Sequence, residues 1–294
     1  MIAARRALLA VLAAAVPLLT VSCGGHARDS AHPPVTSQPQ PSLPAPPTAS
    51  TTSPPPPVTP TQTEAQTTTS PGEGEPQAPH PLAASLLGHE LEQLATERKV
   101  VALTFDAGAN AAGVPSILAT LRRTGVVGTF FLTGRWVQMY PQLARQIGGR
   151  YPVANHTYSH QQLPHLATAA VHSEIERAQS LIRIATGQDP RPLFRFPYGS
   201  SDRRTIRIVN TLGYTAIRWT VDTLGWEGTT RGQSAASITS RVLAALKPGE
   251  IVLMHVGSPP DGSTLDANAL PQIILRIRQR GYSFVAITDF LPTR

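Results

Sequence analysis

Short apolar runs alternate with amphipathic stretches from residue 98 to the end of the chain. Runs of β-branched and aromatic residues predict buried strands over residues 100–105, 128–132, 153–154, 216–221, 250–254 and 284–287. Apolar residues at helical spacing predict helices over residues 114–124, 141–147, 168–185, 205–212, 234–246 and 269–280. This alternation predicts parallel strands covered by helices, either as an irregular (β/α) barrel or as an open doubly wound sheet.

The segment before this region has a different composition. Residues 26–80 consist mainly of Pro, Thr, Ser, Gln and Gly and contain few large apolar side chains. Such a segment buries too little surface to offset the entropy of ordering, so we expect residues 24–97 to form a disordered, extended tether. One compact domain is then expected over residues 98–294, a length that supports a hydrophobic core.

The first 23 residues have the pattern of an export signal. Arg5 and Arg6 precede an apolar run, Ala7 to Val21, that is short for a membrane span. Small residues then lead to Cys23, the only cysteine of the chain, in a pattern similar to the bacterial lipobox, although Thr20 stands where leucine is usual. We expect an extracytoplasmic domain that is anchored to the membrane by lipidated Cys23, or secreted if Cys23 is not lipidated. A single cysteine excludes an intrachain disulfide.

Net charge is unevenly distributed along the chain. Residues 98–294 hold 22 Lys and Arg against 11 Asp and Glu, whereas residues 1–97 hold 3 against 7. A basic domain outside the membrane favours anionic polymers such as the bacterial wall. The chain has no RNA-binding aromatic motif, no zinc-finger spacing and no long basic run, so we expect no nucleic-acid partner. We expect a monomer.

Two histidines four residues apart are the first candidate for chemistry. In the sequence Asn155-His156-Thr157-Tyr158-Ser159-His160, a helical turn would place both imidazoles on one face. That spacing suits a divalent metal, Zn²⁺ above all, which neutral imidazole nitrogens bind at roughly 2.0–2.1 Å. A surface helix that carries two histidines by chance is the alternative interpretation.

Four titratable residues follow the carboxyl ends of predicted strands. They are Asp106, His156, Asp222 and His255. Because active sites in α/β barrels and open sheets lie at that edge, these residues are expected to converge on one pocket. Each residue alone has an ordinary structural interpretation, such as a capping aspartate or a surface histidine, but their shared placement indicates a site.

The motifs around these residues resemble one known family. Thr104-Phe105-Asp106, the histidine pair, Arg195-Phe196-Pro197-Tyr198, Asp222 to Trp226 and Leu253-Met254-His255 are similar, in order and rough spacing, to the polysaccharide deacetylases, the carbohydrate esterases with a NodB-like domain. The resemblance covers nearly all of residues 98–294. It implies a distorted (β/α) barrel and a divalent metal, usually zinc, and removal of acetyl groups from peptidoglycan, chitin, xylan or related polymers.

The resemblance also implies roles for individual residues. Asp106 matches the catalytic base, His156 and His160 match two metal ligands, Arg195 matches the arginine that orients the base, and His255 matches the general acid. An acetamide needs this division of labour, because its carbonyl must be polarised, water must lose a proton, and the departing nitrogen must gain one.

Further matches concern the substrate. Tyr198 matches a tyrosine whose backbone N–H helps to bind the oxyanion, Trp226 matches an aromatic residue that lines the groove, and Leu253 matches the pocket for the acetyl methyl group.

Two positions depart from the family pattern. Ala107 stands where the family usually has the aspartate that is the third metal ligand, so Asp106, Asn110, Asn155 or water would have to fill that place. Gly225 stands where the family has a carboxylate that tunes the general acid. Asp222 could compensate for that loss or could simply cap the end of its strand.

Two classes of function follow. The first is a metal-dependent hydrolase that removes N- or O-acetyl groups from cell-wall polysaccharide, with peptidoglycan as the expected substrate. The second is a NodB-like wall-binding module that has lost catalysis with its third ligand. A deacetylase acting on another polysaccharide, such as chitin or xylan, is a further alternative. Retention of Asp106, Arg195 and His255 together favours the enzyme.

Overall fold

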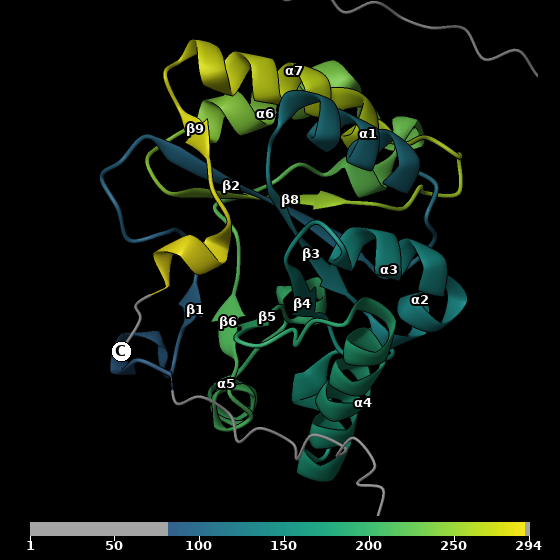
Figure 1. Ribbon diagram of the computed structural model, residues 1–294, viewed down its shortest axis with the longest axis vertical. Helices are drawn as coiled ribbons and strands as arrows, with labels where there is room; N and C mark the ends of the chain where they lie inside the picture. Colours follow the sequence, from purple (N-terminus) through teal and green to yellow (C-terminus); the bar gives the residue numbers. More distant parts are fainter. Residues whose placement is uncertain (1–81, 292–294) are drawn as a thin grey trace, which may run out of the picture. The chain divides into compact units, whose positions relative to one another are not determined.

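The computed structural model describes residues 82–291, and within this range one sheet of nine strands forms the centre of the fold (Figure 1). The strands are β1 (Glu90–Leu91), β2 (Val100–Ala107), β3 (Gly128–Leu132), β4 (Val153–Asn155), β5 (Leu193–Phe194), β6 (Thr215–Ile217), β7 (Val221–Asp222), β8 (Glu250–His255) and β9 (Ser283–Phe284). Every residue of β2 is buried, as expected for a strand with side chains packed on both faces of the sheet.

The strand order is β1-β6-β5-β4-β3-β2-β8-β7, and β9 pairs with the start of β2. All ladders between these strands are parallel. Parallel neighbours need crossover connections, which explains why helices separate most of the strands along the chain.

The sheet closes on itself through the chain that follows β1. Gln93 forms an antiparallel bridge with Glu250, the first residue of β8, and the Leu94 N–H donates to the Gly249 carbonyl at 2.8 Å. This bridge joins the β1 edge to β8 and gives the irregular barrel that the resemblance implied, rather than an open sheet.

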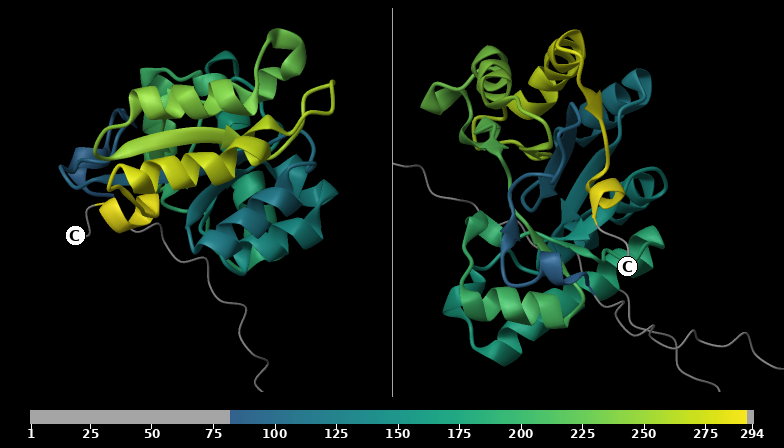
Figure 2. Two further views of the ribbon diagram at one scale, coloured as in Figure 1. Left: turned by 90° about the horizontal axis from the view of Figure 1, so that it is seen from above. Right: turned by 90° about the vertical axis from the view of Figure 1, so that its left-hand side faces the viewer.

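Helices cover the outside of the curled sheet. They are α1 (Val114–Thr124), α2 (Gly134–Met139), α3 (Pro141–Gly148), α4 (Thr168–Thr186), α5 (Arg203–Thr211), α6 (Ala235–Ala245) and α7 (Leu265–Gln279). The helices α6 and α7 pack side by side, with α1 against α7, whereas α4 packs against α2, α3 and α5 (Figures 1 and 2). Four apolar residues bury the inner face of α4 at helical spacing, namely Val171, Ile175, Ala178 and Ile182.

Most predicted elements are present, and two differ. The expected strand over 216–221 is split into β6 and β7, and the expected strand over 284–287 is reduced to β9 before a 3₁₀ turn. The strands β1 and β5 and the helix α2 were not predicted, because each is shorter than a periodic pattern can reveal.

The fold also begins before residue 98, where the sequence placed the start of the domain. Residues 82–97 contribute β1 and Leu94, which is 1% exposed. The expected signal segment (1–23), including Cys23, and most of the expected tether lie outside the described residues. Among residues 82–291, none of the helices combines the length and apolar character needed to cross a bilayer.

Candidate active site

A pocket of about 650 Å³ opens at the carboxyl ends of the central strands. Every site residue predicted from the sequence lines this pocket except Arg195, which lies behind Asp106. The predicted residues that line it are Asp106, His156, His160, Tyr198, Asp222, Trp226, Leu253 and His255. The parallel register brings these strand ends to one edge, as the placement of the titratable residues predicted.

The histidine pair lies on a loop, so the expected helical turn is wrong. Residues 156–160 follow β4 without helical structure, and Thr157 (φ 66°) and His160 (φ 63°) both have left-handed backbones. These two residues turn the chain back, which brings the Nε2 atoms of His156 and His160 to 3.1 Å from each other. Left-handed backbone is costly for a β-branched residue such as Thr157, and such strain is typical of functional sites.

Several hydrogen bonds hold this loop in shape. The Asn155 side chain accepts from the Thr157 N–H at 2.9 Å, and the Thr157 hydroxyl accepts from the His160 N–H at 3.1 Å. From α4, the Glu174 carboxylate accepts from both the N–H and the hydroxyl of Ser159, each at 2.7 Å. Glu174 carries no signal in the sequence, because its contact joins a loop to a helix residue fifteen positions away.

The two imidazoles are set up as neutral nitrogen donors. Nδ1 of His156 is 2.8 Å from the Arg195 carbonyl, so it carries the proton and leaves a lone pair on Nε2. Burial lowers the pKa of His156, and burial together with the neighbouring His156 lowers the pKa of His160 to about 3. Two nitrogens that share a tetrahedral zinc ion lie about 3.3 Å apart, so the 3.1 Å pair fits a divalent cation as two of its ligands.

Asp106 and Arg195 form a buried ion pair beside the histidines. One guanidinium nitrogen donates to Asp106 Oδ1 at 2.6 Å and to the Thr104 hydroxyl at 2.9 Å. The other guanidinium nitrogens reach the backbone carbonyls of Ile217 and Arg218, so the fully buried cation is satisfied on all sides.

The free oxygen of Asp106 faces the histidines. Oδ2 lies 3.4 Å from His156 Nε2. Burial raises the pKa of the Asp106 carboxyl, but the positive charge of Arg195 and the nearby imidazoles lower it by more, so the net pKa lies below the usual aspartate value. Asp106 is therefore an ionised, oriented carboxylate with one oxygen available, which is what a general base requires.

His255 lies across the pocket at the end of β8. Burial lowers the pKa of its imidazole, but the carboxylates of Asp266 and Asp106 raise it by more, so the net pKa lies above the usual histidine value. Asp266, at the start of α7, accepts from the His255 N–H at 2.8 Å. No motif marks Asp266 in the sequence.

Asp222 caps its strand end through two hydrogen bonds, and its charge also contributes to the raised pKa of His255. Its two carboxylate oxygens accept from the Leu224 N–H at 2.9 Å and from the Trp226 indole N–H at 3.3 Å. Within the described residues, Asp222 makes no ion pair with His255. Of the two interpretations offered by the sequence, capping describes the hydrogen bonds of Asp222, while its charge still acts on His255.

Aromatic residues and Leu253 shape the rest of the pocket. Tyr198 is 68% exposed and has a left-handed backbone (φ 59°), and its ring lies edge-on to His160 with centroids 4.6 Å apart. Across residues 82–291, no acceptor is found for the Tyr198 N–H, which leaves this donor for a ligand. Trp226 is 45% exposed at the rim, and Leu253 is 3% exposed in the wall.

Comparisons with known proteins agree with this geometry. The polysaccharide deacetylase family profile matches residues 93–217. The chain is 36% identical over 192 residues to a chitooligosaccharide deacetylase of Bradyrhizobium sp., covering 62% of this chain and 86% of that protein. The chain belongs to the polysaccharide deacetylase family.

This polysaccharide deacetylase family member is also similar to two other proteins. It is 33% identical over 196 residues to the peptidoglycan-N-acetylglucosamine deacetylase PgdA of Listeria monocytogenes, covering 66% of this chain but only 39% of that protein. A solved CE4 family pseudoenzyme from Bacillus anthracis has a TM-score of 0.64 at 29% identity, covering 70% of this chain and 69% of that chain. A mutant of that pseudoenzyme is described as having restored enzymatic activity.

Ala107 stands where the family usually has an aspartate, so no side chain at this position can act as the third metal ligand. Ala107 has no exposed surface and packs in the apolar core with Leu103 and Phe105, on the side of β2 opposite to Asp106. In the part of the chain that the structure describes, no three His, Cys, Asp or Glu side chains form a group that could hold a metal.

The asparagines that the sequence offered as substitutes are occupied elsewhere. Asn155 donates to the Ile175 carbonyl and the Tyr214 hydroxyl, and Asn110 makes its hydrogen bonds with Ala112 and Ser258. Of the protein side chains considered for the third place, only Asp106 has an oxygen directed at the histidines.

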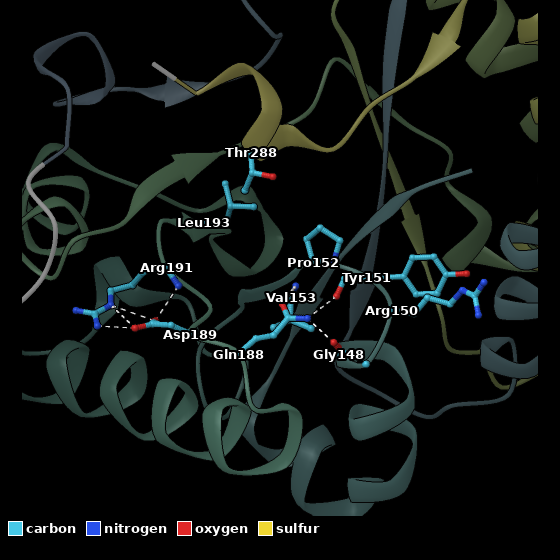
Figure 3. Close-up of a pocket in the computed structure, with 11 residues that line it drawn as sticks. Gly148, Arg150, Tyr151, Pro152, Val153, Gln188, Asp189, Arg191, Leu193 and Thr288 are labelled. Atoms are coloured by element: carbon cyan, nitrogen blue, oxygen red, sulfur yellow. Dashed lines mark hydrogen bonds and ion pairs between the residues drawn. The ribbon is translucent and has the colours of Figure 1, made fainter. Parts of the chain in front are cut away.

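A second hollow of about 500 Å³ lies at the other end of β4 (Figure 3). Its polar side chains already have partners within the hollow: Gln188 donates to the backbone carbonyls of Gly148 and Tyr151, and Arg191 pairs with Asp189. None of the predicted site residues lies there, so the family chemistry belongs to the pocket at the carboxyl ends of the strands.

Proposed function

We propose that this protein is a metal-dependent hydrolase that removes N-acetyl groups from cell-wall polysaccharide, with peptidoglycan as the first candidate substrate. The observation that carries the proposal is the convergence of an ionised Asp106, a facing imidazole pair and His255 on one open pocket. The names of the relatives, which include peptidoglycan and chitooligosaccharide deacetylases, support this substrate class.

The residues divide the reaction between them. Asp106 Oδ2 accepts a proton from water as the water oxygen forms a bond to the acetyl carbonyl carbon, while Arg195 holds Oδ1 in place. His255, whose pKa is raised, donates a proton to the amide nitrogen as the C–N bond breaks. Acetate and the free amine leave, and the Tyr198 N–H is placed to donate to the oxyanion.

His156 and His160 would hold the divalent metal, and Zn²⁺ suits their nitrogen ligands. When bound, such a cation supplies Lewis-acid polarisation of the carbonyl and acidifies water. Water would fill the positions that the two histidines leave open, because the free oxygen of Asp106 is the proposed base.

A second candidate function rests on the incomplete ligand set. A domain with two strong ligands would bind metal weakly, and the similar Bacillus anthracis structure is a pseudoenzyme. The pocket could then bind wall glycan without hydrolysing it. The ion pair of Asp106 and Arg195 argues for the enzyme, because a glycan-binding groove needs no buried, oriented carboxylate.

Acetate release from purified peptidoglycan and from acetylated chito-oligomers, each with and without a chelator, tests the proposal. We expect release from peptidoglycan that the chelator abolishes and added Zn²⁺ restores, with Asp106→Asn as the inactive control. Glycan binding without acetate release in zinc-loaded protein would establish the binding module instead. Release from chito-oligomers alone would keep the chemistry and change the substrate.

We extend the proposal to location. An apolar run before Cys23 supports export and lipidation, with the domain held at the outer face of the membrane by the segment that follows. Mass spectrometry of the mature amino terminus should find an acylated Cys23. In Cys23→Ala we expect protein in the medium or an unprocessed precursor, and an unacylated wild type would overturn the anchor.

A further inference from the structure

The buried carboxylate of Asp266 lies next to His255. Asp266 is 3% exposed, and its Oδ2 accepts from the His255 N–H at 2.8 Å. Its Oδ1 is fully buried and has no hydrogen-bond partner within the described part of the chain. A buried polar atom without a hydrogen-bond partner is costly, so its presence at this place calls for a reason.

Within the described residues, His255 Nδ1 is a second buried atom that lacks a partner beside this carboxylate. This nitrogen is also buried without a hydrogen-bond partner among residues 82–291, and it lies 3.8 Å from Asp266 Oδ2. That separation is longer than a hydrogen bond, but contacts of catalytic groups commonly shorten when substrate binds. The unpartnered imidazole nitrogen therefore lies beside the Asp266 carboxylate, one oxygen of which has no partner in the part of the chain that the structure describes.

Gly225 makes room for this carboxylate. A Cβ on Gly225 would lie 2.5 Å from Cγ and Oδ1 of Asp266 and 2.7 Å from Oδ2, closer than real Cβ contacts. The backbone of Gly225 is not left-handed, so its conformation does not require glycine. What glycine provides here is space, and the space is filled by the carboxylate of Asp266.

We propose that Asp266 is the positioning residue for His255, and that its carboxylate from α7 occupies the volume that a side chain at position 225 would otherwise fill. The Asp266 carboxylate holds the backbone N–H of His255 and, with substrate bound, also accepts from Nδ1 of the imidazole. Nε2 is then left to donate to the substrate nitrogen. The inference rests on the proposed function, in which His255 is the general acid.

The alternative is a purely structural aspartate. Asp266 lies in the first turn of α7, where a carboxylate favours the helix amino terminus. A structural role predicts lost stability on substitution but no change in the imidazole. The test must therefore measure the protonation of the His255 imidazole as well as turnover.

The experiment compares four variants of the full-length protein labelled with ¹⁵N-histidine. Asp266→Asn keeps an acceptor for the His255 N–H and removes the charge. Gly225→Asp alone should clash and lower the melting temperature. Gly225→Asp with Asp266→Ala returns a carboxylate to the same volume from the other segment. Glu227→Gln is the control, since it removes a charge two residues from Gly225 outside the pocket lining.

In Asp266→Asn we expect the His255 ring to lose its proton at lower pH than in the wild type, and kcat to fall roughly 10–100-fold, as for other residues that orient a functional histidine. The double variant should recover both, and Glu227→Gln should change neither. Unchanged ring titration in a folded Asp266→Asn protein would overturn the inference, whether or not activity changes. A wild type without activity but with a shifted ring in Asp266→Asn would overturn the proposed function and leave the pairing intact.

Discussion

Asp106 and His255 are register partners on the adjacent parallel strands β2 and β8. The Val256 N–H donates to the Asp106 carbonyl at 3.1 Å, immediately beyond the pair. The spacing between the proposed base and the proposed acid is therefore set by the hydrogen-bond ladder of the sheet and not by a loop. Sites built on strands hold their geometry more accurately than sites built on loops.

This pairing predicts a broad pH profile for kcat/KM. The base must be deprotonated, so activity falls as pH drops through the pKa of Asp106, which lies below the usual aspartate value. The acid must be protonated, so activity falls as pH rises through the pKa of His255, which lies above the usual histidine value. Rates measured across pH should show both limbs, and His255→Ala should lose the alkaline limb. An alkaline limb at or below the ordinary histidine pKa of about 6.5 would contradict this assignment.

Asp106→Asn separates the base from a metal ligand. If Asp106 acts as the base, activity should fall by roughly 10²–10⁴-fold while zinc, measured by atomic emission after gel filtration, stays bound to the histidines. His156→Ala is the matched comparison, and it should lose both zinc and activity. A parallel loss of zinc in Asp106→Asn would assign the carboxylate to the metal, and the base would then have to be sought elsewhere.

The proposed catalytic part of the site was predictable because its residues lie at strand ends. Asp106, His156, Asp222 and His255 each follow or end a periodic apolar run, and parallel strands bring such residues to one edge. The histidine pair was found for a reason that proved wrong. The i, i+4 spacing suggested a helical turn, whereas the left-handed Thr157 and the hydrogen bonds of its loop bring the rings together.

The supporting residues could not be predicted, because their contacts depend on packing between distant elements. Glu174 on α4 reaches the histidine loop, and Asp266 reaches His255 from the start of α7. Neither belongs to a short motif. Gly225 did signal a departure from the family pattern, but only the structure places the carboxylate of Asp266 in the space that it leaves.

Ala107→Asp tests whether the missing ligand can be restored. The position is fully buried in the apolar core, so in metal-free protein a carboxylate there should lower the melting temperature. If the carboxylate turns toward the histidines when zinc is present, zinc affinity should rise above that of the wild type and recover the stability. Ala107→Asn has nearly the same shape without the charge, so it should lose stability without gaining zinc affinity. Equal zinc affinity in both variants would show that residue 107 does not reach the metal.

The start of the folded domain is open to a direct test. Leu94 is 1% exposed, the Glu92 carbonyl accepts from the Thr220 hydroxyl at 2.7 Å, and β1 forms the edge of the sheet. A fragment of residues 98–294 loses all three and should be less stable than a fragment of residues 82–294, by at least the 2–5 kcal/mol typical of truncating one buried leucine. Urea unfolding of both fragments measures the difference. Equal midpoints would return the boundary to residue 98.

Glu174→Gln tests the clamp on the histidine loop. The Glu174 carboxylate holds the N–H and the hydroxyl of Ser159, one residue before His160, whose left-handed backbone needs such support. Glutamine keeps one acceptor oxygen and loses the charge, so zinc affinity should fall by roughly 10–100-fold, as for other partners that orient metal ligands. Glu176→Gln is the matched control two residues along α4, because its side chain is 58% exposed and its recorded ion pair is with His172. Competition with a fluorescent zinc chelator measures both variants. If Glu174→Gln binds zinc as tightly as Glu176→Gln does, the loop holds its shape through Asn155 and Thr157 alone.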